Sequence, residues 1–326
     1  MVELHIARLY TSGPVELPVI VHHAQADGPT LFVSAALHGD ELNGVEIIRR
    51  LLRSPEMDQI RGTLLAVPII NPLAVIHQSR YLPDRRDLNR SFPGSDKGSF
   101  AARLANLFLT EVVQRCDYGI DLHTGAIHRP NLPQIRADLS QPKNLRMAKA
   151  FGAPLFLDSK PAAGTLREYT TQQNIPVILY EAGEALRFDE TAIRIGVQGV
   201  LNVMQDIGML DAQDAANAGA EPIRAHSSRW LRSPASGMLR AQVDLGESVR
   251  RGQVVAVVGD PYGDEEENIL APADGVIIGR SSLPLVHEGD AVFHLANTDE
   301  PDLAAEVVEQ VQAEALEQDS DEPPIV

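Results

Sequence analysis

Two hydrophobic patterns alternate along the first 210 residues of the chain. Short continuous apolar runs, bounded by glycine, proline or asparagine, are typical of strands buried on both faces of a sheet, and they occur at residues 30–37, 63–70, 118–122, 154–157 and 177–180. Segments with a helical apolar period separate them, at residues 41–52, 100–115, 166–173 and 190–207. This alternation predicts an α/β domain with a mostly parallel or mixed central sheet and helices on both faces.

A different pattern begins after residue 222, where short strand-like segments alternate with turn residues. The stretch repeats itself, because segments 233–239 and 271–277 are similar, as are 249–252 and 286–289. Two similar all-β halves predict a small pseudo-twofold barrel-sandwich domain. The sequence therefore predicts an α/β domain at residues 1–210, a linker at 211–222, a β domain at 223–297 and an acidic C-terminal tail at 298–326. This acidic end is expected to be either a solvated helix or a loose tail.

The overall charge and the cysteine count narrow the class of protein. A formal net charge of −17 would repel nucleic acid and anionic membrane surfaces. Cys116 is the only cysteine, which excludes an intrachain disulfide. The chain shows neither a secretory signal pattern nor an apolar run near the roughly 18 residues that span a membrane. We expect a cytoplasmic protein that binds neither nucleic acid nor membranes, and a homo-oligomer is compatible with the sequence.

Three residues of metal-ligating types are predicted at the carboxyl ends of strands. His38 and Glu41 follow the strand at 30–37, and His123 closes the strand at 118–122. Ligand sites in open α/β sheets collect at this edge of the sheet. Two imidazoles and one carboxylate, with a fourth position open, form the ligand set of a catalytic zinc ion. The sequence thus predicts one zinc ion per chain, held by these three side chains.

Two neighbouring residues fit this site. Gly39 is expected to let the backbone bend sharply between the first two ligands. Asp121 shares a strand face with His123 and is predicted to orient its ring. Each residue taken alone also has a purely structural interpretation. Glu41 could be a carboxylate that is stabilised by a helix N-terminus, and His123 could be a polar residue whose hydrogen bonds are all made within the fold.

An ordered series of motifs resembles the succinylglutamate desuccinylase/aspartoacylase family, which is related to the zinc carboxypeptidases. The motifs are His-Gly-Asp-Glu-Leu-Asn-Gly at 38–44, Asn-Pro at 71–72, Arg-Tyr at 80–81, Asp-Leu-Asn-Arg at 87–90, Asp-Leu-His at 121–123 and Tyr-Glu-Ala-Gly at 180–183. They lie in order between about residues 30 and 208. The resemblance implies a zinc carboxypeptidase-like fold for residues 1–210 and a zinc-dependent amidohydrolase that acts on linear amides.

The resemblance also implies roles for single residues. It places zinc on the same three ligands and makes Glu181 the carboxylate that acts as general base and acid. Arg80 would hold the substrate carbonyl oxygen, and Asn89 with Arg90 would bind a substrate carboxylate. Guanidinium suits both tasks, because it is always charged and donates bidentately to planar anions.

Alternatives remain for these roles. Glu181 could instead pair with a neighbouring arginine, and Glu184 is a rival for the same task. Compared with the family pattern, the chain carries extra residues between the Arg-Tyr motif at 80–81 and the Asp-Leu-Asn-Arg motif at 87–90. Arg85 or Arg86 could therefore replace Arg80 at the site.

The β domain resembles biotinyl and lipoyl carrier modules, which bear their cofactor on a lysine. The last lysine of the chain is Lys160, which excludes carriage. A lid, a wall over the mouth of the active site or an oligomer contact remain as roles. The spacing of His287, Asp290 and His294 matches no metal-binding pattern, so we expect these residues on the barrel surface.

The sequence therefore predicts zinc-dependent hydrolysis of a small, carboxylate-bearing N-acyl amino acid or related amide. A metallocarboxypeptidase that acts on short peptides is the enzymatic alternative, and a non-catalytic zinc-dependent binding module is the alternative from another class. Acidic loops near the predicted mouth weakly favour a neutral or cationic leaving amine.

Overall fold

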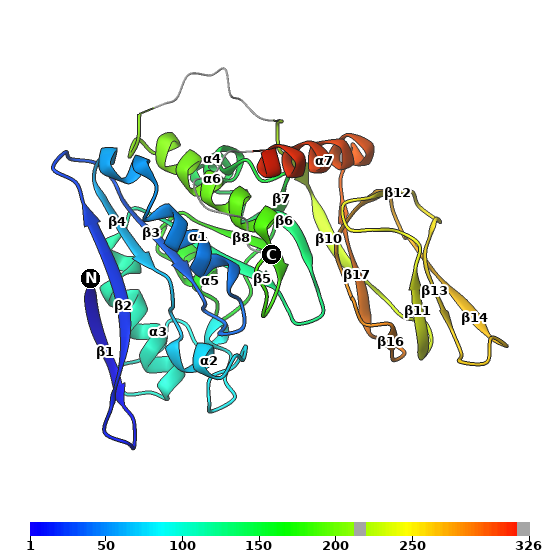
Figure 1. Cartoon of the computed structure of the whole chain (residues 1–326), viewed down its shortest axis with the longest axis horizontal. Coiled ribbons are helices and arrows are strands. Elements are labelled where there is room, and N and C mark those ends of the chain that lie inside the picture. The colour runs from blue at the N-terminus through cyan, green and yellow to red at the C-terminus, as the bar shows by residue number, and fades with distance from the viewer. Residues whose placement is uncertain (212–219, 318–326) are drawn as a thin grey trace.

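The computed structural model describes residues 1–211 and 220–317. A mixed sheet crosses the α/β part of the molecule (Figure 1). Its centre consists of four parallel strands, which lie in the order β4 (Thr63–Val67), β3 (Thr30–Ala35), β5 (Tyr118–Gly125) and β8 (Val177–Glu184). Antiparallel strands flank them, namely β1 (Val2–Arg8) with β2 (Pro14–His23) at one edge and β6 (Asn131–Ala137) beside β8. The predicted α/β class with a mixed sheet is confirmed.

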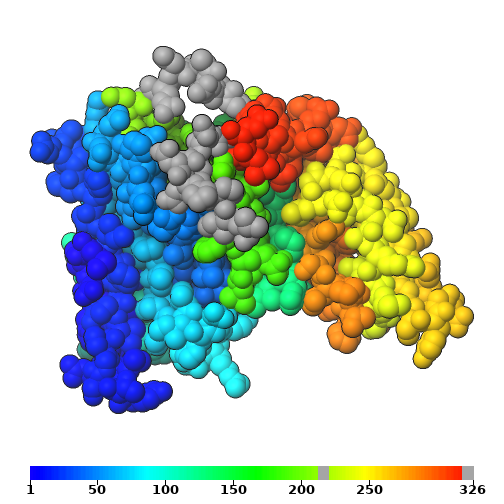
Figure 2. Space-filling view, in the orientation of Figure 1, coloured from blue at the N-terminus to red at the C-terminus, as the bar shows by residue number. Residues whose placement is uncertain are grey.

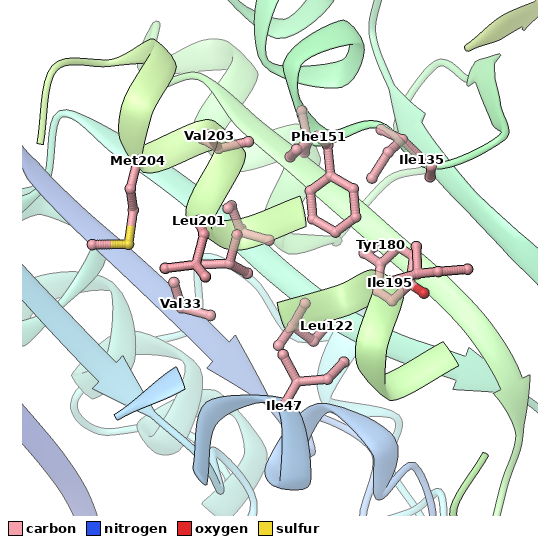
Figure 3. Packing of buried hydrophobic residues seen from close by; sticks show 14 of the residues in the cluster. Val33, Ile47, Leu122, Ile135, Phe151, Tyr180, Ile195, Leu201, Val203 and Met204 are labelled. Carbon is pink, nitrogen blue, oxygen red and sulfur yellow. The ribbon is translucent and has the colours of Figure 1, made fainter. Parts of the chain in front are cut away.

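Helices cover both faces of this sheet and bury its apolar side chains. One face packs against α1 (Asn43–Leu51), α4 (Pro142–Phe151) and α6 (Glu190–Asp206). Figure 3 shows this core, where the Phe151 ring lies 4.8 Å from that of Tyr180. The other face packs against α3 (Phe100–Glu111) and α5 (Leu166–Gln172), near the short α2 (Pro72–Ile76). Short 3₁₀ turns complete this part, at η1 (Pro55–Gln59), η2 (Leu88–Arg90) and η3 (Val113–Arg115).

The β domain has a core of its own between two layers of strands, of which one continues the large sheet of the α/β part and the other is a separate four-stranded sheet. One contains β10 (Ser227–Arg232), β12 (Ser248–Val249), β15 (Gly275–Arg280) and β17 (Ala291–Asn297). The other contains β11 (Gly237–Ala241), β13 (Val254–Gly259), β14 (Glu266–Leu270) and β16 (Leu285–Val286). The two halves of the sequence repeat are interleaved in the structure. β11 and β12 of the first half pair with β16 and β15 of the second half, respectively. The predicted additional β domain is thus confirmed.

The two parts share strands and a buried core. β7 (Leu155–Asp158) pairs with β6 and with β9 (Ile223–Ala225), and Gly279 of β15 pairs with Asn131 of β6. A core at this junction combines Leu132 and Leu155 with Val276 and Ile278. Asn131, which lines the cavity described below, therefore lies at the junction with the β domain.

The C-terminal segment forms a helix where the sequence analysis placed a tail at 298–326. Helix α7 (Pro301–Glu317) buries Ala304, Val307, Val308 and Val311 against the rest of the molecule. Figure 2 shows it in red between the α/β part and the β domain. The acidic residues lie on the exposed face of the helix. Of the two forms that the sequence left open for this end, a solvated helix and a loose tail, residues 301–317 therefore adopt the helix, which also packs by its apolar face. Residues 318–326, and positions 212–219 of the predicted linker, lie outside the described residues.

Helices long and apolar enough to cross a membrane are not found among the described residues. The cytoplasmic location and the domain boundaries stay predictions.

Candidate active site

His38 and Glu41 lie in the connection between β3 and α1, at the carboxyl edge of the sheet. Gly39 between them does not adopt a positive φ. Instead the loop passes so close to α2 that a Cβ on Gly39 would lie 2.0 Å from the carbonyl carbon of Ala74. The glycine is therefore required by a close backbone approach, and the predicted sharp bend is not the reason for it.

The three predicted metal ligands converge. Their ligand atoms all lie within 4.8 Å of one another, and all three residues are buried. Nδ1 of His38 lies 2.6 Å from Oε1 of Glu41, and Nδ1 of His123 lies 2.7 Å from Oε2 of the same carboxylate. The structure thus brings together side chains that are 82 residues apart in the chain, and they form a possible metal site.

A carboxylate lies behind each imidazole. Nε2 of His123 is 2.8 Å from Asp121 Oδ2, and the other Asp121 oxygen accepts a hydrogen bond from the Ser34 hydroxyl at 2.8 Å. Nε2 of His38 is 3.2 Å from Oδ1 of Asp87. Such partners fix the ring orientation of metal-binding histidines. Asp121 occupies the position predicted for it, whereas the contact of Asp87 was not predicted.

The charges at this point favour a cation. Burial lowers the pKa of both rings and is the largest single effect. The charge of Glu41 together with hydrogen bonds to Asp87 and Glu41 still raises the pKa of His38, and the charges of Asp121 and Glu41 together with their hydrogen bonds raise the pKa of His123. Burial would raise the pKa of Glu41, yet the two rings hold that pKa far below its usual range. Positive charge is therefore stabilised between the three side chains, as a divalent cation requires.

Glu181 lies next to this cluster. It is the register partner of His123 on the adjacent parallel strand, so both side chains point to the same face of the sheet. Its carboxylate accepts a hydrogen bond from Asn131 Nδ2 and lies 2.9 Å from Nε of Arg136. The arginine pairing raised as an alternative is therefore present in the structure. The rival Glu184 is buried and accepts from the backbone nitrogen of His128 instead.

Arg80 is the arginine that faces the cluster. Its Nη1 lies 3.3 Å from Nδ1 of His38, and its Nη2 lies 3.1 Å from Oδ2 of Asp87. Arg85 and Arg86 are exposed and do not line the cavity. Of the three arginines, Arg80 is therefore the one that lies beside the cluster.

Asn89 and Arg90 line the same cavity, close to the start of α5. The Asn89 side-chain oxygen accepts from the backbone nitrogen of Leu166 at 3.1 Å. Its amide nitrogen is then the group that can donate to a ligand. Arg90 is exposed and donates to the carbonyl oxygen of Asn89 at 2.6 Å.

The cavity measures about 350 Å³ and contains all seven predicted site residues. It also contains polar residues to which sequence reasoning gave no role, among them Arg129, Asn131, Arg136, Lys160, Arg167 and Trp230. Arg129, Asn131 and Arg136 follow the predicted ligand His123 closely in the sequence, which marks them as candidates for the lining of the pocket. No motif marked Arg167, whose guanidinium donates to the carbonyl oxygen of Ser159 at 2.9 Å. Burial and the neighbouring Arg136 lower the pKa of Arg167 to about 10.

Comparison with known proteins gives the same picture at the level of the family. A family model described as the succinylglutamate desuccinylase/aspartoacylase catalytic domain matches residues 27–207. The Nα-acetyl-L-2,4-diaminobutyric acid deacetylase of Halomonas elongata is 28% identical over 298 residues, which cover 87% of this chain and 86% of that protein. The succinylglutamate desuccinylase of Pseudomonas aeruginosa is 28% identical over 201 residues, or 56% of this chain and 59% of that protein.

Solved structures agree with these relatives. A product-bound ectoine utilization protein from Ruegeria pomeroyi superposes with a TM-score of 0.81 at 25% identity, over 91% of this chain and 94% of that chain. A succinylglutamate desuccinylase/aspartoacylase from Rhodobacter sphaeroides superposes with a TM-score of 0.80 at 26% identity, over 91% and 93%. These relatives span both parts of the molecule and include deacylating amidohydrolases. The chain belongs to the succinylglutamate desuccinylase/aspartoacylase family.

Proposed function

We propose that this protein is a zinc-dependent amidohydrolase that hydrolyses the amide bond of a small N-acyl amino acid. The observation that carries the proposal is the convergence of His38, Glu41 and His123 in a cavity that also holds Glu181 and several arginines. The deacylases named among the relatives support the reaction class.

The donor set fits zinc. Two imidazole nitrogens and one carboxylate are the ligands of many catalytic zinc sites, and here both rings turn Nδ1 toward the carboxylate. Asp87 and Asp121 hold the opposite ring nitrogens. When bound, zinc supplies Lewis-acid chemistry and lowers the pKa of water.

The side chains around the ligands then handle protons and charge. Glu181 takes a proton from the attacking water and later delivers it to the leaving amine. Asn131 and Arg136 orient its carboxylate. Arg80, held by Asp87, stabilises the negative charge that develops on the carbonyl oxygen. Asn89 and Arg90 bind the α-carboxylate of the amino acid from the α5 side of the cavity.

The charge of the cavity bears on the substrate. Its lining contains six basic side chains and two acidic ones, so a carboxylate-rich substrate is favoured over one with a free amine. The two named relatives differ in this respect, because diaminobutyrate carries a second amine and succinylglutamate carries extra carboxylates. The acidic loops weakly favoured a neutral or cationic leaving amine. The basic lining disfavours such an amine, since the charges nearest the substrate are positive.

Replacing Glu181 with glutamine tests the proposal. We expect zinc to stay bound in the Glu181→Gln variant, because none of the three ligands changes, while kcat for N-acyl amino acids falls by about 10²–10⁴-fold. Metal analysis and steady-state kinetics measure the two effects. Glu184→Gln is the matched control, since Glu184 lies three residues further along the same strand and does not line the cavity; this variant should keep its turnover.

A Glu181→Gln variant with unchanged turnover would assign proton transfer to another group. The same assay separates the alternatives. Faster cleavage of dipeptides than of N-acetyl and N-succinyl amino acids would make the protein a carboxypeptidase. Stoichiometric zinc with ligand affinity, but without hydrolysis of either substrate class, would make it a binding module.

A further inference from the structure

The only tryptophan of the chain lies in the wall of the proposed active site, although it belongs to the β domain. Trp230 is part of β10 and lines the same cavity as His38, Glu41 and His123. The β domain therefore takes part in the cavity directly. Of the roles left open by the sequence, a wall beside the active site is the one that this position supports.

The indole ring is fixed by its own domain. Trp230 and His294 are cross-strand partners in the pairing of β10 with β17, and their rings stack 4.6 Å apart at an angle of 9°. His294 is 4% exposed and its Nε2 lies 2.9 Å from the Ser228 hydroxyl. The expectation that His294 lies on the barrel surface is therefore wrong. Burial, together with Arg136, lowers the pKa of His294 to about 3, so the ring is neutral near pH 7.

An arginine from the other domain contacts the same indole. The guanidinium carbon of Arg129 lies 5.5 Å from the centroid of the Trp230 ring, a cation–π distance. Arg129 belongs to the loop between β5 and β6, which the β domain holds through a hydrogen bond from Ser282 N to His128 O at 2.9 Å. The pair of Arg129 and Trp230 thus spans the domain boundary.

Two arginines of the cavity are held by carboxylates, because Asp87 pairs with Arg80 and Glu181 pairs with Arg136. Arg90 and Arg167 instead donate to the carbonyl oxygens of Asn89 and Ser159, and Arg129 is the one that an aromatic ring holds. Among residues 1–211 and 220–317, no carboxylate forms an ion pair with Arg129, and the Trp230 ring is its side-chain contact. An aromatic face holds a guanidinium in place without neutralising its charge. The charge of Arg129 is therefore left for a ligand.

We propose that Arg129 is a specificity-determining residue that binds a carboxylate of the substrate remote from the scissile amide, and that Trp230 is the positioning residue that holds it. Asn89 and Arg90 approach from the α5 side, so the Arg129 wall is left for a different group of the substrate. That group is a distal carboxylate, on either the acyl chain or the amino-acid side chain. This inference rests on the proposed hydrolysis of N-acyl amino acids and extends it to substrate selection.

Fluorescence gives a direct test, because Trp230 is the sole source of tryptophan emission. The zinc-loaded full chain is titrated with succinate against butyrate, and with L-glutamate against L-glutamine. We expect saturable emission changes, with the carboxylate-bearing member of at least one pair binding about tenfold or more tightly. The pair that shows this preference tells whether the carboxylate belongs to the acyl or the amine portion. In Arg129→Gln the preference should disappear, and in Arg129→Lys part of it should remain.

Kinetics separates positioning from a general structural effect. We expect Trp230→Ala to raise KM about tenfold for substrates with the distal carboxylate, with little change in kcat or in KM for their amide analogues. Trp230→Phe, which keeps an aromatic face, should restore KM. Far-UV circular dichroism checks folding, and Arg129→Gln serves if Trp230→Ala does not fold.

Equal losses for substrates with and without the distal carboxylate, or a binding preference that survives in Arg129→Gln, would overturn the inference. Its failure is distinguishable from failure of the proposed function. An active deacylase without Arg129-dependent preference loses only this inference. A protein that cleaves no N-acyl amino acid but shows the preference in fluorescence loses only the reaction.

Discussion

His38 and His123 present the same ring nitrogen, Nδ1, to the carboxylate of Glu41. The geometry follows from the carboxylates behind the rings, because Asp87 and Asp121 each take up the Nε2 side. A histidine whose outer nitrogen is held this way has a fixed tautomer and little freedom to rotate. The ligands are thus arranged by residues that would not themselves touch a metal.

His294 supports a residue-scale prediction about pH. Its pKa is lowered to about 3 from the ordinary 6.5, so the unfolded chain binds a proton that the folded chain excludes. The stabilisation from the neutral ring is complete above pH 6.5 and is lost as the pH falls from 6.5 toward 3. Between pH 7 and pH 4.5 this amounts to about 2 kcal/mol of unfolding free energy. His294→Phe keeps a ring on Trp230 but cannot titrate.

We therefore expect the unfolding free energy of the wild type to fall more steeply than that of His294→Phe over this range. Urea unfolding followed by circular dichroism at several pH values measures both curves. Parallel curves for the two proteins would mean that His294 is protonated in the folded state as easily as in the unfolded chain.

At the level of single residues, the sequence predicted those site residues whose position follows from the local pattern of strands and helices. His38, Glu41 and His123 could be predicted because each sits where a strand ends, and strand ends meet at one edge of a parallel sheet. The contact between Trp230 and Arg129 could not be predicted, because the two residues are 101 positions apart and meet only through the packing of two domains.

At the level of elements, the apolar runs located β3, β4, β5, β7 and β8 to within a few residues. β2 was not predicted although its buried positions alternate with period two, because it lacks the continuous apolar run by which the other strands are recognised. β6 was missed because it carries Pro133 and the buried, polar Gln134. Strand order was not predictable, since neighbouring strands are selected by packing rather than by local sequence.

Helix α7 supports an element-scale prediction. Val311 is 9% exposed and packs into the core of the α/β part, whereas Leu316 on the same helix is 58% exposed. Val311→Asp would bury a carboxylate without a partner and should cost about 2–4 kcal/mol of unfolding free energy. Leu316→Asp, the matched control, should stay within about 0.5 kcal/mol of the wild type. Urea denaturation measures both.

A similar, small cost for the two substitutions would show that α7 does not pack on the core in solution. In that case the acidic C-terminal region would behave as the tail that composition suggested.

On the scale of the whole molecule, the two parts are joined by continuous structure. Pairing of β15 with β6 and of β7 with β9 carries the sheet across the boundary, and the junction core mixes residues from both sides. Helix α7 contacts α6 on one side and β12 with β15 on the other. Separating the parts would expose this apolar surface to water, which opposes independent unfolding.

We therefore expect the protein to unfold in one cooperative transition. Tryptophan emission reports the β domain and its contact with the α/β part, because Trp230 is the only tryptophan and lies in β10 beside Arg129. Far-UV circular dichroism reports mainly the helices, which in the described residues lie in the α/β part and in α7. Urea curves from the two probes should have coincident midpoints, as two-state unfolding requires. A lower midpoint for the fluorescence curve would show that the β domain opens first, and the cavity wall formed by Trp230 would then be lost before the catalytic fold.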